Sequence, residues 1–236
     1  MSNSYFQFKQ FTIEQSGCAM KVGTDGCLLG GWFDTSCSKR ILDIGCGTGL
    51  ISIMAAQRCD ADITGVEIDK AASEQARTNV DNSPWSDRIS ILNTDILLYS
   101  PEQPFDTIVC NPPYFVNSLK CGTESRTLAR HSDTLDCTSF FKKAISLLAD
   151  GGRISIVIPC DILDEWKDAA AINGFANSRL TYIKTTPSKA PKRVLAEFAR
   201  AYTVETIVST LVLEDKPGVY SKDAQEILRD FYLKIV

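Results

Sequence analysis

The chain has 236 residues, which suits a single domain large enough to bury a substantial core. Apolar residues make up 44% of it and charged residues 23%, the balance of an ordinary globular protein. No apolar run approaches the ~20 residues that a membrane span needs, and the start lacks the basic and then apolar layout of a signal peptide. These features predict a cytoplasmic protein.

The nine cysteines are scattered without a Cys-x-x-Cys pair, and the only histidine is His131. Structural zinc usually takes paired ligands at short spacing, so no metal site is expected. Without a secretion signal, the thiols are expected to be reduced and to pack as small apolar groups.

The net charge of −4 argues against a large nucleic-acid footprint, because phosphate binding relies on clustered lysine and arginine. One region has the opposite local charge. Between positions 184 and 200 a single acid, Glu197, stands among basic residues. These are Lys184, Lys189, Lys192, Arg193 and Arg200. The region is therefore a candidate contact for nucleic acid.

In chain order, an aromatic extension (1–39) precedes a regularly patterned stretch (40–236), and together they are expected to form one domain. From residue 40 onward, short apolar, β-branched runs alternate with helical stretches. The candidate strands are Arg40–Gly45, Asp62–Ile68, Ile89–Asp95, Phe105–Asn111, Arg153–Pro159, Arg179–Thr185 and Val194–Tyr202. The candidate helices are Gly49–Cys59, Lys70–Asn82, Thr138–Leu148 and Ile162–Asn173.

This alternation predicts a doubly wound α/β fold whose mostly parallel, seven-stranded sheet is covered by helices on both faces. The last two candidate strands are separated only by Thr186–Arg193, which is too short for a crossover helix. They are therefore expected to pair as a terminal antiparallel hairpin. Beyond them, Glu205–Leu213 is a further strand candidate, and Ser221–Lys234 predicts a final helix with Ser221 as its N-cap.

A glycine-rich loop, Asp43–Gly49 (DIGCGTG), joins a predicted strand to a predicted helix. Glycines there permit a tight turn and a close approach of a ligand to the backbone. A dinucleotide fingerprint needs glycine at position 50, where this chain has Leu50. The spacing resembles the first motif of S-adenosylmethionine-dependent methyltransferases, in a Rossmann-like fold. It implies that Asp43, Gly45 and Gly47 bind that cofactor, and a turn without a ligand is the alternative.

Two acidic residues end the next two candidate strands. Glu67 can accept hydrogen bonds from both ribose hydroxyls of an adenosine cofactor. Asp95 can hold the adenine amino group, while the backbone N–H of Ile96 donates to a ring nitrogen. The alternative is that both acids are solvated strand ends or helix caps. Asp69 is better interpreted as the N-cap of the following helix.

The fourth candidate strand runs into Asn111-Pro112-Pro113-Tyr114, the most specific motif of the chain. It resembles the catalytic tetrapeptide of enzymes that methylate planar amino nitrogens. Such a nitrogen is a poor nucleophile, because its lone pair is delocalised. The Asn111 side-chain oxygen and the Pro112 carbonyl can accept its two N–H groups and favour pyramidalisation, and Tyr114 can stack on the base. The catalysis expected is orientation and charge stabilisation, without a general base. A strand-terminating turn is the structural alternative.

Four further segments are similar to bacterial tRNA adenine-N6 methyltransferases, which act on the adenine next to the anticodon of a valine tRNA. They are Met20–Trp32, Ala129–Ser132, Pro191–Leu195 and Phe231–Leu233. The resemblance spans nearly the whole chain. It implies tRNA as the partner and a cofactor site covered by the extension.

By the same resemblance, Lys21 and Thr24 would lie near the cofactor, with a helix start capped by Thr24 or Asp25 as the alternative. Contacts to RNA would come from Pro113, Arg130, Lys189, Lys192 and Arg193. His131 is favoured as a surface residue, and a merely solvated loop is the alternative for Lys189–Arg193.

Several other functions share parts of this pattern. A glutamine-N5 methyltransferase acting on a translation factor would share the Asn111 motif, but such enzymes carry a helical N-terminal domain that forty residues cannot supply. A methyltransferase of rRNA or DNA amino groups, a nucleotide-binding oxidoreductase and a noncatalytic RNA-binding module remain further alternatives. Leu50 and the predicted hairpin oppose the oxidoreductase. A monomer is the default expectation.

Overall fold

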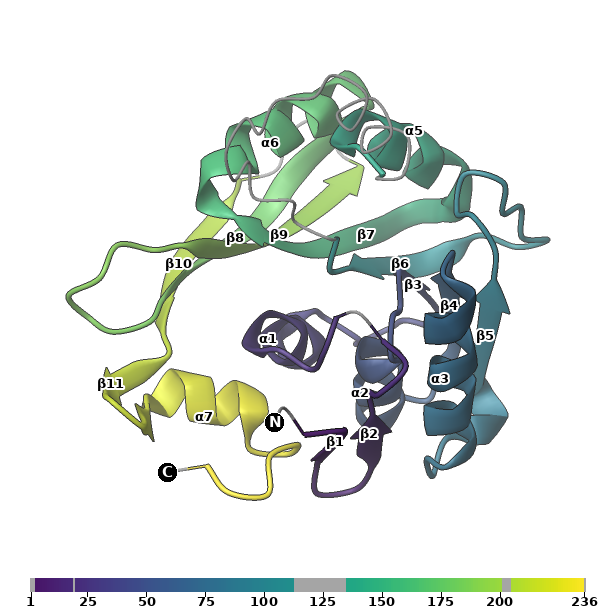
Figure 1. Cartoon of the computed structure of the whole chain (residues 1–236). Helices are drawn as coiled ribbons and strands as arrows, with labels where there is room; N and C mark the ends of the chain where they lie inside the picture. The colour runs from purple at the N-terminus through teal and green to yellow at the C-terminus, as the bar shows by residue number, and fades with distance from the viewer. Residues whose placement is uncertain (1–2, 19, 113–134, 201–204, 236) are drawn as a thin grey trace, which may run out of the picture.

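A computed structural model describes residues 3–18, 20–112, 135–200 and 205–235 (Figure 1). Its centre is an eight-stranded sheet in the order β10-β8-β9-β7-β6-β3-β4-β5. The strands are β3 (Arg40–Ile44), β4 (Asp62–Glu67), β5 (Ile89–Asn93), β6 (Phe105–Cys110), β7 (Leu148–Pro159), β8 (Phe175–Lys184), β9 (Arg193–Arg200) and β10 (Ile207–Val212). Neighbours pair in parallel except β9, which is antiparallel to both β7 and β8.

The predicted α/β fold with a mostly parallel sheet is confirmed, and so is the antiparallel pairing of β8 with β9. The strand count and the terminal place of the hairpin need correction. β10, the candidate strand Glu205–Leu213, pairs in parallel with β8 from Ile207↔Arg179 to Val212↔Lys184. The hairpin therefore does not end the sheet, because β10 pairs with the outer edge of β8.

Helices cover both faces of the sheet (Figure 1). α5 (Cys137–Leu147) and α6 (Leu163–Ile172) lie on one face. The other face carries α1 (Thr24–Trp32), α2 (Leu50–Arg58), α3 (Lys70–Asp81) and α7 (Lys222–Leu228). Two short 3-10 turns, η1 (Ser86–Arg88) and η2 (Cys160–Ile162), precede β5 and α6. No helix in the described ranges is long and apolar enough to cross a membrane.

Two separate hydrophobic cores follow from the alternation of side chains along the strands. Ile41 of β3 packs into the core on the α1 side, and its neighbour Leu42 packs into the core on the α5 side. In β7, Val157 and Ile156 divide in the same way. Near-continuous apolar runs in the central strands are therefore explained by burial on both faces.

The N-terminal residues contribute to the core on the α1 side. β1 (Tyr5–Gln7) and β2 (Thr12–Glu14) form a small antiparallel hairpin. Phe8, Ile13 and Leu28 are fully buried in the same cluster as residues of α2 and α7. A second small hairpin, β11 (Glu214–Lys216) and β12 (Val219–Tyr220), leads into α7.

The final helix begins as predicted but ends earlier. The Ser221 hydroxyl caps it by accepting a hydrogen bond from the Ala224 N–H over 3.1 Å. The helix stops at Leu228, six residues before the predicted Lys234. The chain then turns to meet the N-terminus, where Tyr232 forms a β-bridge with Phe8. This long-range pairing overrides the local helical preference.

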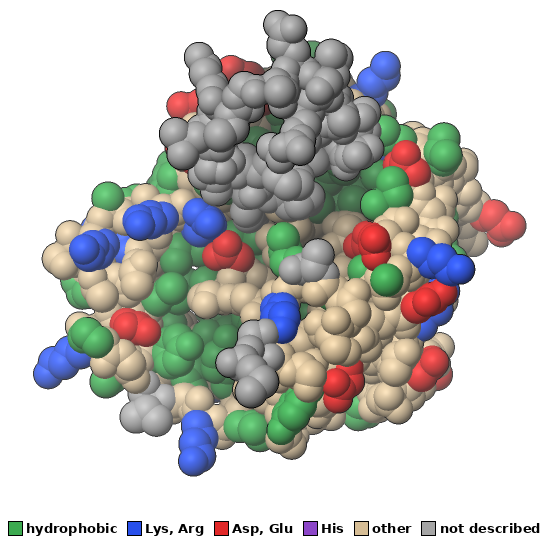
Figure 2. All heavy atoms as spheres, in the orientation of Figure 1, with side chains coloured by type: hydrophobic (Ala, Val, Ile, Leu, Met, Phe, Trp, Pro, Cys, Tyr) green, Lys and Arg blue, Asp and Glu red, His purple; other side chains and the backbone are tan. Residues whose placement is uncertain are grey.

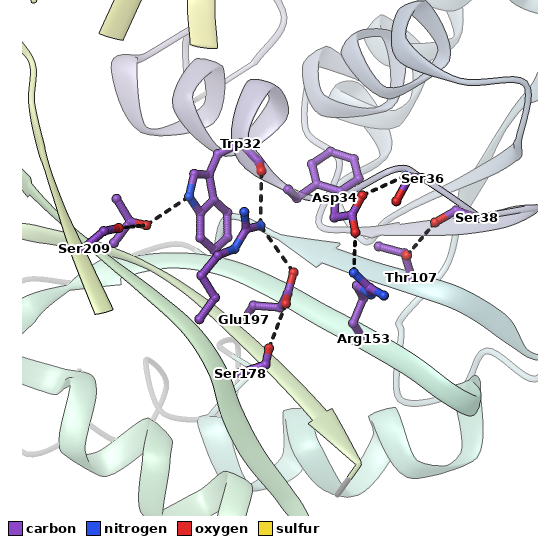
Figure 3. A network of polar contacts seen from close by, with 12 residues as sticks. Trp32, Asp34, Ser36, Ser38, Thr107, Arg153, Ser178, Glu197 and Ser209 are labelled. Atoms are coloured by element: carbon purple, nitrogen blue, oxygen red, sulfur yellow. Dashed lines mark hydrogen bonds and ion pairs between the residues drawn. The ribbon is translucent and has the colours of Figure 1, made fainter. Parts of the chain in front are cut away.

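The carboxyl end of α1 is fixed to β8 and β9 by a network around Trp32 (Figure 3). The Arg179 guanidinium lies 3.7 Å from the centre of the Trp32 ring and donates to the Trp32 carbonyl oxygen. Arg179 also pairs with the buried Glu197, 3.3 Å away. The Trp32 indole N–H donates to the Thr181 hydroxyl over 3.1 Å. The contacts of Trp32 with Arg179 and Thr181 join residues more than 140 positions apart and hold this end of the helix against the sheet.

Close helix packing explains two adjacent glycines in α1. A methyl group on Gly30 would lie 2.6 Å from the Met54 sulfur of α2. One on Gly31 would lie 2.6 Å from the Ile227 carbonyl oxygen of α7. Neither α2 nor α7 could pack so close to α1 if positions 30 and 31 carried side chains.

Gly31→Ala is therefore expected to destabilise the protein by about 1–3 kcal/mol, because the methyl group meets backbone that cannot move aside. Gly23→Ala is the matched control, since a methyl group there meets only the Lys21 carbonyl oxygen at 3.8 Å. It is expected to cost less than about 1 kcal/mol. Urea unfolding of the three proteins measures both differences. Equal stability of the two variants would contradict this account of the α1–α7 contact.

Candidate functional site

The candidate site lies at the carboxyl edge of the parallel strands. Ile44, the last residue of β3, is paired with Cys110 of β6 on one side and with Val66 of β4 on the other. The glycine loop and Asn111 therefore leave neighbouring strands at the same level, about 5 Å apart, which is the spacing of hydrogen-bonded strands. Glu67 follows Val66 directly, so the three predicted motifs meet at one place.

The glycine loop has the backbone conformation that its sequence requires. Gly45 and Gly47 have φ values of 68° and 55°, in the left-handed region that residues with a side chain rarely adopt. A methyl group at Gly45 would meet no atom within 4 Å. The loop therefore presents open backbone surface at the start of α2, where a ligand can approach closely.

Glu67 ties the glycine loop to the next helix. Its Oε2 atom accepts a hydrogen bond from the Gly47 N–H, and its Oε1 atom accepts one from the Asp69 N–H, each 2.9 Å long. An ionised carboxylate has about four lone-pair sites, so each oxygen keeps capacity for a ligand hydroxyl. Asp69 caps α3 by accepting from the Ala72 N–H over 2.8 Å, as predicted.

Asp43 is a buried carboxyl group with an unsatisfied oxygen. It is 1% exposed, and its Oδ2 atom accepts a hydrogen bond of 2.7 Å from the Ser52 hydroxyl. Its Oδ1 atom has no hydrogen-bond partner among the described residues. Burial, with a smaller contribution from the nearby charge of Glu67, raises the pKa of Asp43 to about 7 against the opposing effect of hydrogen bonds from Ser52. Such an atom suits a cationic partner, because it compensates an otherwise costly buried charge.

Asp95 lies in a turn after β5. Its Oδ1 atom accepts a hydrogen bond from the Leu97 N–H over 2.8 Å, so one oxygen stabilises the turn. The side chain is half-buried. Ile96 beside it is buried in the core on the α5 side. The other carboxylate oxygen of Asp95, Oδ2, is therefore the atom expected to contact a cofactor.

Asn111 and Pro112 follow β6 directly, with Asn111 half-buried and Pro112 buried. The first turn of α1 lies against the Asn111 amide, because a methyl group on Gly26 would be 3.7 Å from Asn111 Nδ2. The same methyl group would be 3.3 Å from a Leu50 methyl carbon, at the start of α2. Gly26 therefore occupies a narrow place between the glycine loop helix and the amide.

Four residues singled out in the sequence lie outside the described part of the chain. They are Pro113, Tyr114, Arg130 and His131. Lys21 and Thr24 are described and exposed, in the segment that leads into α1. The N-cap of α1 is Gly23, without a side-chain hydrogen bond, so the alternative of a Thr24 or Asp25 cap is wrong.

The loop between β8 and β9 reaches the same edge of the sheet, because Arg193 pairs with Pro159 at the end of β7. Lys189 and Lys192 are exposed in this loop. Figure 2 shows Lys and Arg side chains gathered at the left of the molecule, where the β8–β9 loop lies in Figure 1. Arg193 differs from its neighbours, because its Nε atom donates to Asp25 Oδ2 of α1 over 2.9 Å.

Two thiols line the strand ends without taking part in the polar network described above. Burial raises the pKa of both the Cys46 and the Cys110 thiol well above the ordinary value. Eight cysteines are described and all are free. Such thiols stay protonated and pack as small apolar groups, as the sequence predicted.

The comparisons with known proteins agree with this geometry. The family model of the methyltransferase small domain matches residues 18–163. A predicted O-methyltransferase from Agrobacterium tumefaciens has the same fold, with a TM-score of 0.71 at 20% identity over 90% of this chain and 99% of that one. A glycopeptide N-methyltransferase complexed with S-adenosylmethionine superposes with a TM-score of 0.56 at 13% identity, over 77% of this chain and all of the other.

The chain thus has the fold of class I S-adenosylmethionine-dependent methyltransferases, and the family-model match makes it a methyltransferase of the small-domain family. Relatives in Phocaeicola vulgatus and Bacteroides thetaiotaomicron, both named tRNA1(Val) (adenine(37)-N6)-methyltransferase, are 47% and 45% identical over the full length of both chains. A relative of the same name in Trichodesmium erythraeum is 41% identical over 99% of this chain. The chain belongs to the tRNA1(Val) (adenine(37)-N6)-methyltransferase family.

Proposed function

We propose that the protein transfers the methyl group of S-adenosylmethionine to the N6 amino group of adenine 37 in a valine tRNA, as the names of its relatives state for them. One observation supports the chemistry most strongly: the Ile44↔Cys110 pairing, which sets Asn111 beside the glycine loop. Because tRNA is the substrate, we infer that the protein acts in the cytoplasm.

The residues of the site fit S-adenosylmethionine. The open backbone at Gly45 and Gly47 leaves room for the cofactor, and Asp43 Oδ1 offers a buried negative charge to its cationic end. Glu67 has capacity for the ribose hydroxyls, and Asp95 and Ile96 would hold the adenine. The exposed residues Lys21 and Thr24 would contact the cofactor from the α1 side.

When bound, the cofactor supplies an electrophilic methyl carbon on a sulfonium sulfur. The Asn111 side-chain oxygen and the Pro112 carbonyl oxygen accept hydrogen bonds from the two N–H groups of the adenine. These bonds orient the nitrogen lone pair toward the methyl carbon and stabilise the positive charge that develops on nitrogen. Water then takes the released proton. Tyr114 would stack on the base, and stacking contributes about 1–3 kcal/mol.

The RNA would approach along the carboxyl edge of the sheet. Lys189 and Lys192 are exposed there and would contact phosphates. Pro113 and Arg130 would contact the target nucleotide or its neighbours. An adenine stacked in the anticodon loop must turn outward to reach Asn111.

Methylation assays with purified components test this function. The protein is incubated with labelled cofactor and an unmodified valine tRNA transcript, and nucleosides are analysed for N6-methyladenosine. The expected result is one methyl group per transcript, lost when adenine 37 is replaced by guanine. A purified release factor in a parallel reaction tests the glutamine alternative. Labelling of the protein but not of the tRNA would reject the proposal.

A further inference from the structure

Beyond the residues that would touch substrate, α1 joins two parts of the site that are far apart in sequence. Its first turn lies close to Asn111, since a methyl group on Gly26 would be 3.7 Å from Asn111 Nδ2, and the preceding residue, Asp25, is paired with Arg193 at the start of β9. Asp25 and Arg193 are 168 positions apart. One helical turn therefore lies between the Asn111 amide and the end of the β8–β9 loop.

The pair is placed to control only the first turn of the helix. The other end of α1 is held by the Trp32 network (Figure 3) and by the close contacts of Gly30 and Gly31 with α2 and α7. At the first turn, Gly23 caps the helix without a side-chain hydrogen bond. The Asp25–Arg193 pair is therefore a polar side-chain restraint that acts directly on this turn.

Orientation of the amide follows from this restraint. The Asn111 amide is planar, so a neighbour that fixes the position of Nδ2 also fixes the direction of the side-chain oxygen. Gly26 lies on the nitrogen side, where an added methyl group would be 3.7 Å from Nδ2. A shift of the first turn toward β6 would press on the amide nitrogen and turn the acceptor away from the target nitrogen.

We propose that the Asp25–Arg193 pair is a positioning device, which couples the RNA-binding β8–β9 loop to the orientation of the Asn111 amide. This inference rests on the proposed function. In this proposal Arg193 acts through its pair with Asp25, while Lys189 and Lys192 contact phosphate. When RNA binds the two lysines, the strand start that carries Arg193 is held, and with it the first turn of α1.

Asp25→Ala and Arg193→Ala are expected to lower kcat about tenfold or more, since small misplacements of positioned groups can cost up to about 100-fold. Their KM for tRNA and their Kd for S-adenosylhomocysteine should stay within about threefold of wild type, because neither residue binds a ligand. The exchange variant Asp25→Arg/Arg193→Asp restores the pair with reversed polarity. It should recover most of the lost kcat.

Two controls separate this role from simple stability or phosphate binding. Asp34→Ala breaks the Asp34–Arg153 pair, which has 33% and 38% exposed side chains against 31% and 33% for Asp25 and Arg193. That pair lies at the opposite edge of the sheet, so kcat should not change. Lys189→Ala should instead raise the KM for tRNA and weaken its salt dependence.

The result that would overturn the coupling is wild-type kcat in Asp25→Ala, or an Arg193→Ala variant whose only defect is a salt-sensitive rise in KM. Failure of the exchange variant to exceed the two single variants would also overturn it. Wild-type protein measured in the same assay separates failure of the coupling from failure of the proposed function. If wild type does not methylate the tRNA, the function itself fails, whatever the variants do.

Discussion

Asn111→Ala is expected to lower the rate of methyl transfer by about 10²–10³-fold, the usual cost of removing one preorganised hydrogen-bonding group from an active site. The alanine variant loses the acceptor that orients the target nitrogen. It keeps the glycine loop, Glu67 and Asp43, so its Kd for S-adenosylhomocysteine should change less than about tenfold. Single-turnover assays with tRNA measure the rate, and calorimetry measures the Kd.

Asn111→Asp is the matched variant, because it keeps a side-chain oxygen at the same place. It should be more active than Asn111→Ala if accepting a hydrogen bond is the role of the residue. Parallel losses of methyl transfer and cofactor binding in Asn111→Ala would identify a cofactor-binding residue instead. An Asn111→Ala variant as fast as wild type would exclude the proposed chemistry.

Cofactor binding is expected to tighten roughly 10–20-fold in total between pH 5.5 and 7, because the ionised fraction of Asp43 rises by about that factor as the pH approaches its pKa. Burial raises the pKa of Asp43 to about 7, so at lower pH the group is mostly protonated and cannot face a cation as a carboxylate. Asp43→Asn should bind S-adenosylhomocysteine about 10–100-fold more weakly at pH 7.5, because hydrogen bonds to charged groups contribute about 1.5–3 kcal/mol. It should also lose the pH dependence.

The same residue affects the stability of the ligand-free protein in the opposite direction. Its pKa is higher in the folded chain than the ordinary value of 3.8, so the folded state binds the proton more tightly. The stabilisation from this group is complete below about pH 4 and is lost as the pH rises toward 7. Calorimetric titrations of wild type and Asp43→Asn across this range test the affinity for S-adenosylhomocysteine, and urea unfolding of the ligand-free proteins tests the stability. A wild-type affinity that is flat in pH would contradict the assigned pKa.

Local sequence patterns predicted most of the fold. Alternating apolar strands and helices gave the parallel sheet, and the short Thr186–Arg193 connection gave the antiparallel hairpin. Caps were also predictable, because Asp69 and Ser221 bond to N–H groups three residues away. These features depend on neighbours in the chain, which a sequence displays directly.

Features that depend on distant partners were not predictable in the same way. The early end of α7 depends on a bridge between Tyr232 and Phe8. Arg193 looked like one of several loop cations, and only the fold brings it to Asp25. Gly26 gave no signal of its own, because its role is to leave room beside Asn111. The chemistry of the site was visible in the motifs, and the supports that position it were not.

The pairing of the two ends of the chain has a consequence for biosynthesis. Lys9 donates its backbone N–H to the Phe231 carbonyl oxygen, and Phe8 and Phe231 lie in one buried cluster. This half of the interior is completed only after Phe231 and Tyr232 have left the ribosome. A nascent chain therefore carries apolar side chains such as Phe8 without their cover until that segment emerges.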